Sequence, residues 1–400
     1  METIDTTRPA FERMALSVMK RYPPDKVRWH YEHGLMLQSV WAVGKAVLNG
    51  EENAYGSAYG AWVTLMYDTK IDGKGRIQGY RADEFNLDQI NAGKALFDLW
   101  RETGNRRYRV AIETLHGQME RQPRTRSGGF WHKKIYPYQM WLDGVYMAEP
   151  FNARYIREFG GGDGANGSVY ADVVRQFTLM AEKARDPKTG LLYHAWDESR
   201  EQCWADPETG CSPHFWGRAL GWYCMALVDT LDIIPHADVD ARAPLTAIAR
   251  SLVGPILAVQ DAESGLWYQV LDQGGREKNY LESSASAMFC YFFYKVLNNG
   301  LAEKDAEPAL REAAVRAWDG LLRLKVRDDA GGDLHLTDIC AVAGLGGTPY
   351  RDGSYDYYVG EPVATDDFKG VGPFILAGIE READNKRDAH STVNNLRNGI

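Results

Sequence analysis

The sequence has 400 residues, of which 44% are hydrophobic and 25% are charged, and its formal net charge is −9. This is the composition of an ordinary globular protein that is long enough to bury a large core. The negative charge argues against nonspecific nucleic-acid binding, which needs a basic face. It still allows a small anionic ligand, because a few local cationic side chains are enough to bind one.

Cysteine usage and the N-terminal residues set expectations about cofactors and location. The five cysteines form no Cys-x-x-Cys pair, so neither a disulfide framework nor a zinc site is expected. His30 and His33 have the spacing of two metal ligands, but no third ligand lies nearby, and we expect no metal or other cofactor. Neither a signal peptide nor a membrane-spanning stretch is visible. We therefore expect a cytoplasmic protein with no membrane partner, either a monomer or a weak homo-oligomer.

Apolar residues recur at helical spacing along most of the chain, whereas convincing period-two alternation is short and rare. The chain is therefore predicted to be mainly α-helical. In chain order the stripes are Met36, Val40, Val43 and Val47; Leu87, Ile90, Gly93, Phe97 and Trp100; Tyr108, Ile112, Leu115 and Met119; Val173, Phe177 and Met180; Phe215, Ala219, Trp222 and Ala226; Leu245, Ile248 and Leu252; Phe289, Phe293 and Val296; and Leu310, Ala314, Ala317, Leu321 and Leu324.

A loop pattern recurs between these helices. Residues 186–193 and 261–268 share an Asp, a Gly four residues later and a closing Tyr, and residues 329–335 are a weaker copy. Gly79 and Gly129 look like degenerate members. The spacing of roughly 50 to 75 residues fits two helices for each repeat, and about six helix pairs for the chain, as in a ring. The loops would then gather on one face, but spacing alone does not establish that the ring closes.

No linker divides the chain. We expect one domain over residues 1–383, followed by a polar, frayed tail over residues 384–400. The glycine-rich stretch at residues 160–167 is interpreted as a surface loop that forms an edge of the pocket and not as a domain boundary.

Two acids stand among apolar and aromatic neighbours. Asp143 lies in the stretch 137–151, and Asp88 lies upstream in the stretch 85–94. Burial among such neighbours raises the pKa of a carboxyl group, which suits it to donate a proton near neutral pH. We interpret the two carboxylates as facing one pocket. The alternative for each is a helix cap or an ion-pair partner.

The chain is rich in aromatic residues, with 12 Trp, 22 Tyr and 13 Phe. Trp and Tyr combine a flat apolar face with a polar group, which matches the faces and hydroxyl edges of sugar rings. Most of these residues are expected to fill the core. Trp41 is either a core residue or a platform for a sugar.

Cationic groups beside aromatic residues are candidates for binding a carboxylate. His132 and Lys133 follow an aromatic pair in a predicted loop, and Arg218 follows Trp216 and Gly217 at a helix start. A guanidinium matches a carboxylate bidentately. The alternatives are a solvated basic loop and a structural ion pair. Because no serine elbow, phosphate loop or dinucleotide fingerprint is present, these residues favour acid–base chemistry on an anionic carbohydrate.

The chain resembles glycoside hydrolase family 105, the unsaturated rhamnogalacturonyl hydrolases, which are related to family 88. The likeness runs over nearly the whole chain. Its motifs are at residues 29–34, 86–90, 129–133, 140–144, 193–196, 216–218, 354–358 and 369–374.

The resemblance implies an (α/α)6 barrel that acts on a small anionic oligosaccharide. Such enzymes remove a 4,5-unsaturated uronic acid by hydrating its enol-ether double bond. By the resemblance, Asp143 is the general acid that protonates C4 and then takes the proton of the attacking water, and Asp88 positions the ring and stabilises the charge. The residues expected to bind the sugar are Trp41, His132, Lys133, His194, Trp216 and Arg218.

Three other functions remain open at this point. One is the same chemistry on unsaturated glucuronyl sugars derived from glycosaminoglycans, as in family 88. A second is a sugar epimerase on the same barrel, which would rely on a histidine pair. The third is a carbohydrate-binding ring without catalysis, which would have no need for Asp143.

Overall fold

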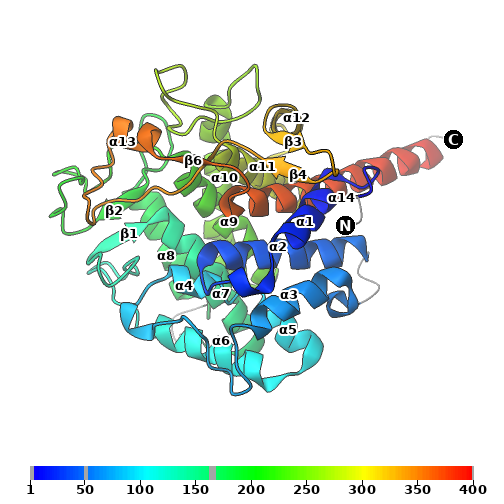
Figure 1. Cartoon of the computed structure of the whole chain (residues 1–400). Coiled ribbons are helices and arrows are strands. Elements are labelled where there is room, and N and C mark those ends of the chain that lie inside the picture. The colour runs from blue at the N-terminus through cyan, green and yellow to red at the C-terminus, as the bar shows by residue number, and fades with distance from the viewer. Residues whose placement is uncertain (1–3, 49–52, 162–167, 399–400) are drawn as a thin grey trace.

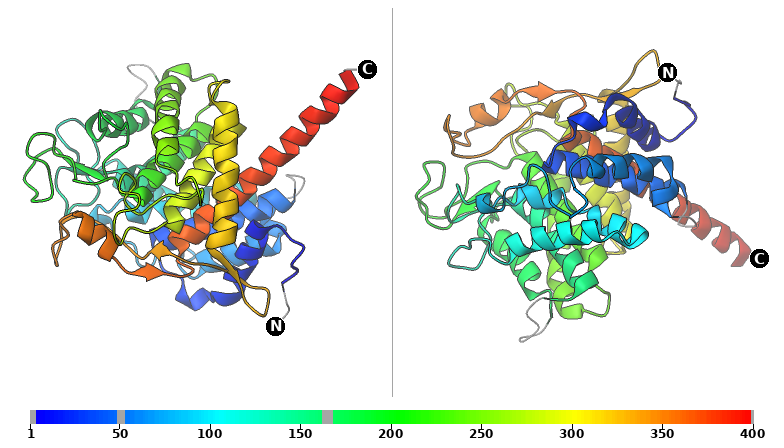
Figure 2. Two further views of the ribbon diagram at one scale, coloured as in Figure 1. Left: turned by 90° about the horizontal axis from the view of Figure 1, so that it is seen from above. Right: turned by 60° about the horizontal axis from the view of Figure 1, so that its bottom comes forward.

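The computed structural model describes residues 4–48, 53–161 and 168–398, and the side chains up to residue 387. Its helices form an (α/α)6 barrel, in which an inner ring of helices is surrounded by an outer ring (Figures 1 and 2). The inner ring contains α2 (Tyr31–Val47), α4 (Asp88–Asn91) with α5 (Leu96–Thr103), α7 (Leu142–Phe159), α9 (Gly217–Ile233), α11 (Ser283–Asn298) and α14 (Phe368–Asn398). The outer ring contains α1 (Ala10–Arg21), α3 (Ala58–Asp68), α6 (Arg106–Met119), α8 (Ala171–Lys183), α10 (Val239–Ala258) and α12 (Glu307–Leu324).

The ring closes because α14, the last inner helix, packs against both α11 and α2, the first. The inner helices α9 and α11 are buried on nearly all sides. The outer helices α6 and α12 instead bury only the stripe that faces the inner ring. This difference is expected from position, since an inner helix contacts neighbours all round and an outer helix has one face in water.

Short antiparallel strand pairs connect the helices at one end of the barrel. The strand β1 (Gln139–Trp141) pairs with β2 (Ala195–Asp197), and Trp141 lies opposite Ala195. The other pairs are β3 (Val326–Asp328) with β4 (Leu334–Leu336) and β5 (Ile339–Cys340) with β6 (Val363–Ala364). A short helix, α13 (Tyr355–Gly360), lies between β5 and β6 in the chain.

The recurring loops share one hydrogen-bonded turn. In the turns at Asp186 and Asp261, the carboxylate accepts from the backbone and hydroxyl of the residue three positions later. The backbone carbonyl of each Asp accepts from the glycine four positions later, which has a positive φ. Asp206 makes the same turn with Thr209, and this copy did not stand out in the sequence. The Asp, the hydroxyl residue and the Gly therefore have a local structural role.

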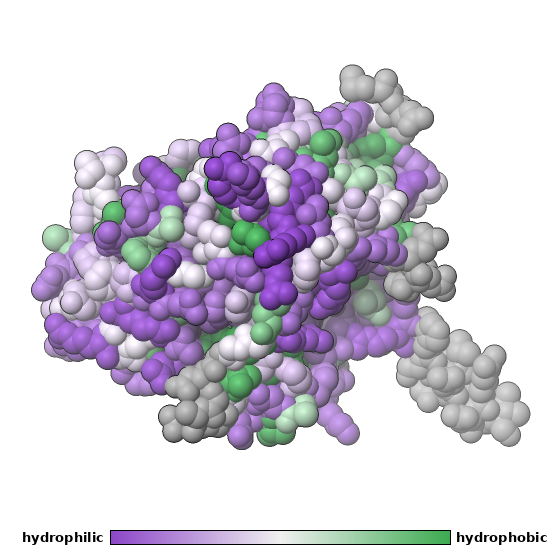
Figure 3. Space-filling view, turned by 90° about the horizontal axis from the view of Figure 1, so that it is seen from below, coloured by the Kyte–Doolittle hydropathy of each residue, from purple (hydrophilic) through white to green (hydrophobic). Residues whose placement is uncertain are grey.

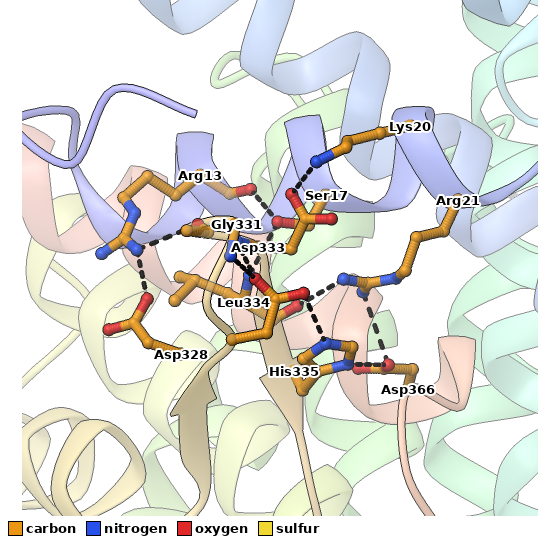
Figure 4. Close-up of polar contacts among 12 residues, drawn as sticks. Arg13, Ser17, Lys20, Arg21, Asp328, Gly331, Asp333, Leu334, His335 and Asp366 are labelled. Carbon is orange, nitrogen blue, oxygen red and sulfur yellow. Dashed lines mark hydrogen bonds and ion pairs between the residues drawn. The ribbon is translucent and has the colours of Figure 1, made fainter. Parts of the chain in front are cut away.

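A polar network fixes the β3–β4 hairpin against the outer helix α1 (Figure 4). Lys20 lies 3.0 Å from the carboxylate of Asp333, and the backbone N–H of Leu334 donates to the Ser17 hydroxyl over 2.8 Å. His335 then contacts Asp366 over 2.6 Å. Because Asp366 lies two residues before the start of α14, this network also holds the segment that leads into the last inner helix.

Residues 384–398, predicted as a frayed tail, continue α14 as a helix that projects from the barrel in Figure 2. Most of the predicted pocket-edge loop, at residues 162–167, lies outside the described residues.

Over the described residues, no helix combines the length and the apolar character needed to cross a membrane. The face in Figure 3 is mainly hydrophilic, with hydrophobic residues scattered in small groups.

Candidate active site

A cavity of about 440 Å³ lies where several inner helices begin. Four of its charged residues occupy the first turns of those helices: Glu32 in α2, Asp88 in α4, Asp143 in α7 and Lys369 in α14. Neither Asp88 nor Asp143 accepts a hydrogen bond as a helix cap. The helix starts thus bring together charged side chains from distant parts of the sequence. The cavity is lined by Arg28, His30, Tyr31, Glu32, Asp88, His132, Lys133, Tyr136, Trp141, Asp143, Met147, Ala341, Val342, Ala343, Arg351, Asp367 and Lys369.

Asp88 is paired with two of the predicted sugar-binding residues. Its Oδ2 lies 2.6 Å from Nζ of Lys133, and its Oδ1 lies 3.4 Å from Nε2 of His132. Burial favours a raised pKa for Asp88, but the Lys133 ammonium and His132 outweigh it and hold the pKa below its ordinary value. Burial lowers the pKa of His132 to about 4, although Asp88 opposes this shift. At neutral pH the group is therefore a carboxylate, an ammonium and a neutral imidazole.

Asp143 has a different environment. Its Oδ2 lies 3.3 Å from Nε2 of His194, outside hydrogen-bond geometry, and it accepts no hydrogen bond from the described residues. The β1–β2 pairing creates this proximity, since the backbone N–H of Leu142 donates to the carbonyl of His194. The other ring nitrogen of His194, Nδ1, lies 2.7 Å from the Tyr358 hydroxyl. Burial raises the pKa of Tyr358 well above its ordinary value, so this hydroxyl remains protonated.

An aromatic stack forms one wall of the cavity. The rings of His132 and Trp141 are 4.6 Å apart, and those of Trp141 and Tyr136 are 4.9 Å apart, with nearly parallel planes in both pairs. Gly144 makes room for the stack, because a Cβ at this position would lie 2.8 Å from Nδ1 of His132. The stack lines the same cavity as the two acids and is a flat aromatic surface, of the kind that packs against a sugar ring.

A second charged group in the cavity was not predicted from the sequence. Nζ of Lys369 lies 2.5 Å from Glu32 and 2.8 Å from Asp367. Burial favours a raised pKa for Glu32, but His30 and Lys369 hold it far below its ordinary value. Glu32 and Lys369 are both the second residue of an inner helix, as Asp143 is in α7. Both residues lie in motifs that the chain shares with family 105, at residues 29–34 and 369–374, and this is the signal that could have identified them.

The structure places the other predicted sugar-binding residues behind the wall of this cavity. Trp41 and Trp216 are buried and do not line it. Arg218 is also buried; its Nη1 donates to the carbonyl of Cys340, and its guanidinium lies 4.8 Å from the Trp216 ring. His194 is fully buried and does not line the cavity, but it contacts two lining residues, Asp143 and the ring of Trp141. Of the eight predicted site residues, the cavity is therefore lined by Asp88, His132, Lys133 and Asp143.

His30 and His33, which have the spacing of metal ligands, point to different partners. Nδ1 of His30 lies 3.5 Å from Glu32 in the cavity, whereas Nδ1 of His33 lies 3.1 Å from the Tyr22 hydroxyl. Across the described residues, no three His, Cys, Asp or Glu side chains come together in a way that could hold a metal ion.

Comparisons with known proteins agree with this architecture. The model of Glycosyl Hydrolase Family 88 matches residues 10–384. A solved family 105 glycoside hydrolase from C. acetobutylicum ATCC 824 is 41% identical, with a TM-score of 0.86, over 94% of this chain and all of that one. Protein Atu3128 of Agrobacterium fabrum is 43% identical over 58% of this chain and 97% of its own length. The unsaturated rhamnogalacturonyl hydrolase YesR of Bacillus subtilis is 29% identical over 50% of this chain and 56% of its own length.

Proposed function

The chain belongs to glycosyl hydrolase family 88, together with the family 105 structures, and we propose that it removes a 4,5-unsaturated galacturonosyl residue from the non-reducing end of rhamnogalacturonan oligosaccharides. The observation that carries the proposal is the convergence of Asp88 and Asp143 on one cavity beside a flat aromatic wall. Because the chain belongs to a family of hydrolases, we favour hydrolysis over the two alternatives, a sugar epimerase and a carbohydrate-binding ring without catalysis.

In the proposed reaction, Asp143 starts as a carboxylic acid and protonates C4 of the double bond. Positive charge develops at C5, where the ring oxygen shares it, and water adds there. Asp143, now a carboxylate, takes the proton released by that water and is ready for the next cycle. The hemiketal formed at C5 opens, and the resulting hemiacetal at C1 expels the remaining sugar chain. The retaining and inverting distance rule does not apply, because no nucleophile substitutes directly at C1.

The surroundings of the two acids support this division of roles. Asp143 has no cation within ion-pair distance among the described residues except His194, should that ring become protonated, and this setting suits a group that gains and loses a proton. Asp88 is held ionised by Lys133, which suits a group that accepts hydrogen bonds from ring hydroxyls. A fixed negative charge beside C5 also stabilises the positive charge that develops there.

Two observations support rhamnose as the next sugar. The relative YesR carries the name of a rhamnogalacturonyl hydrolase. In addition, Ala341, Val342 and Ala343 line the cavity, and the side chain of Val342 is half exposed. A short apolar segment of this kind matches the methyl group of a 6-deoxy sugar, which has no hydroxyl at that carbon to leave unpaired.

The experiment compares three disaccharides by the ultraviolet absorbance of the conjugated C4–C5 double bond. We expect the absorbance to fall with unsaturated galacturonosyl-rhamnose, and much more slowly with an unsaturated chondroitin disaccharide. The saturated galacturonosyl-rhamnose is the control and should release no rhamnose. Faster consumption of the chondroitin disaccharide would replace the proposed substrate with a glucuronyl one. Release of rhamnose from the saturated control would contradict the hydration chemistry.

A further inference from the structure

The four lysine and arginine side chains that line the cavity fall into two classes. Lys133 is paired with Asp88, and Lys369 is paired with Glu32 and Asp367. Arg28 and Arg351 line the same cavity, and in the described part of the chain no acid lies within ion-pair distance of either. Two guanidinium charges therefore face the cavity without a carboxylate partner.

Arg351 is held in place by neutral groups. Its Nη2 donates to the Tyr136 hydroxyl over 2.8 Å and to the Leu345 carbonyl over 3.1 Å, and its Nε donates to the Gly346 carbonyl over 2.9 Å. These hydrogen bonds fix the plane of the guanidinium and leave its charge uncompensated. A side chain that is already ordered loses little conformational entropy when it binds a ligand.

The two arginines lie toward the mouth of the cavity. In the aromatic stack, His132 and Trp141 are buried, whereas Tyr136, which contacts Arg351, is half-buried. Arg28 is exposed and Arg351 is half-buried, while the side chains of Asp88 and Asp143 are only 14% and 13% exposed. The ring that reacts must lie beside the deep acids. The part of the oligosaccharide that leaves must then extend outward past the arginines.

We propose that Arg28 and Arg351 form an anion subsite for the leaving part of the oligosaccharide, so that the preferred substrate carries a second carboxylate there in addition to that of the unsaturated ring. This inference rests on the proposed function and narrows its substrate class. The planar fork of a guanidinium matches a carboxylate bidentately. Because rhamnose is the residue next to the unsaturated ring in the proposed substrate, the second carboxylate belongs to the residue that follows the rhamnose.

A competing assignment is that the two arginines bind the carboxylate of the unsaturated ring itself. The two assignments differ in one measurable quantity, the ratio of kcat/KM for an acidic leaving group to kcat/KM for a neutral one. If the arginines contact only the unsaturated ring, their removal lowers both values equally. If they contact the leaving part, their removal lowers the ratio.

The test uses three substrates with the same unsaturated galacturonosyl residue. The leaving part is rhamnose, galacturonic acid, or rhamnosyl-galacturonic acid, so the second carboxylate is absent, adjacent or one residue further away. We expect the parent enzyme to prefer the substrate with rhamnosyl-galacturonic acid over the one with rhamnose by about tenfold, the usual effect of one charge-assisted hydrogen-bonded pair. In the double variant Arg28→Gln/Arg351→Gln this preference should disappear, and Arg351→Lys should retain only part of it.

Two controls separate a subsite from a general charge effect. Arg109→Gln removes the same charge from the outer helix α6, where Arg109 pairs with Glu113, and should leave the ratio unchanged. Raising the salt concentration should lower kcat/KM for the acidic substrates in the parent and have little effect in the double variant. A parent enzyme without preference for an acidic leaving part, or an equal loss on all three substrates in the double variant, would overturn the proposal.

A binding measurement keeps the subsite testable if the proposed reaction is wrong. Calorimetric titration with saturated galacturonosyl-rhamnosyl-galacturonic acid and with saturated galacturonosyl-rhamnose needs no turnover. The Kd of the first ligand should rise about tenfold from the parent to the double variant, the Kd of the second should change little, and both should stay the same in Arg109→Gln. Absence of turnover together with this rise would contradict the proposed function and retain the subsite. Turnover together with an unchanged Kd and an unchanged ratio of kcat/KM values would retain the proposed function and contradict the subsite.

Discussion

Nε2 of His194 lies 3.3 Å from Oδ2 of Asp143, and the Tyr358 hydroxyl lies 2.7 Å from the other nitrogen of the same ring. When Tyr358 donates to Nδ1, the proton of the neutral ring is on Nε2 and faces Asp143. The histidine is fully buried, and its ring is held by the Tyr358 hydroxyl and by contacts with the rings of Trp141 and Trp216. We interpret His194 as a positioning residue that acts through Asp143, and not as a group that binds the sugar directly.

This interpretation predicts the effect of removing the imidazole. His194→Gln should lower kcat by about hundredfold, because a small displacement of a general acid has a large effect on rate, and KM should change little. Tyr358→Phe should lower kcat by about tenfold, since it removes only the hydroxyl that fixes the tautomer. Steady-state kinetics on the unsaturated disaccharide measures both. A direct role in binding would instead raise KM and leave kcat unchanged.

The Asp88–Lys133 pair predicts a change in pH dependence. The pKa of Asp88 lies below its ordinary value, because Lys133 and His132 outweigh its burial. Activity that needs the ionised Asp88 is therefore present at neutral pH and is lost as the pH falls through that lowered pKa. In Lys133→Met the burial remains and the ammonium is gone, so the pKa rises and activity is lost at a higher pH. The acidic limb of the kcat/KM profile measures this shift, and an unchanged limb would contradict the role of Asp88.

Gly144 should not tolerate a side chain. A Cβ there would lie 2.8 Å from Nδ1 of His132 and 3.3 Å from Leu87, so Gly144→Ala should displace His132 from its stack on Trp141. We expect a loss of about 1 to 3 kcal/mol in the free energy of unfolding, together with a lower kcat/KM. Gly117 in α6 is the matched control, because nothing lies within 4 Å of a Cβ at that position. Gly117→Ala should stabilise the protein slightly, by up to about 1 kcal/mol.

Lys369 should contribute to stability as well as to the cavity. It is 2% exposed and lies between Glu32 and Asp367, so Lys369→Met leaves two carboxylates without their cation. The free energy of unfolding at neutral pH should fall by about 3 kcal/mol or more. Lys183→Met, at an exposed pair with Glu182, is the control and should change it by no more than about 0.5 kcal/mol.

The effect of Lys369 should also depend on pH. Because the folded-state pKa of Glu32 is lowered, its contribution to stability is present above its ordinary pKa and is lost as the pH falls through the lowered value. The difference in unfolding free energy between the parent and Lys369→Met should therefore shrink in acid. Chemical denaturation at several pH values measures it. A difference that stays constant as the pH falls would show that the loss comes from packing alone.

Much of the fold follows from sequence periodicity. The stripes that begin at Met36, Tyr108 and Leu310 lie in α2, α6 and α12, and the ring that their number suggested is closed by contacts of α14 with α11 and α2. The stripe from Leu87 to Trp100 is divided into α4 and α5, because residues 92–95, which include Gly93, form turns. The spacing of the stripes could not reveal this break, since both parts keep their apolar residues in phase.

Only those site residues that lie in a recognisable sequence motif could be predicted. The cavity is lined by Asp88 and Asp143, which we interpreted from the sequence as facing one pocket, and by His132 and Lys133. Arg218 could not be placed from the sequence, because its interaction with the carbonyl of Cys340 depends on how distant loops pack. The same holds for Arg28 and Arg351, which lie in no motif and line one cavity only because the fold brings distant parts of the chain together.

The most direct test of the central claim is the loss of double-bond absorbance with the parent enzyme and with Asp143→Asn, each mixed with unsaturated galacturonosyl-rhamnose. We expect the parent to consume the double bond and Asp143→Asn not to consume it, while the variant unfolds at the same temperature and still binds the disaccharide. If Asp143→Asn consumed the double bond as fast as the parent, Asp143 would not be the proton donor, and the proposed mechanism would be wrong.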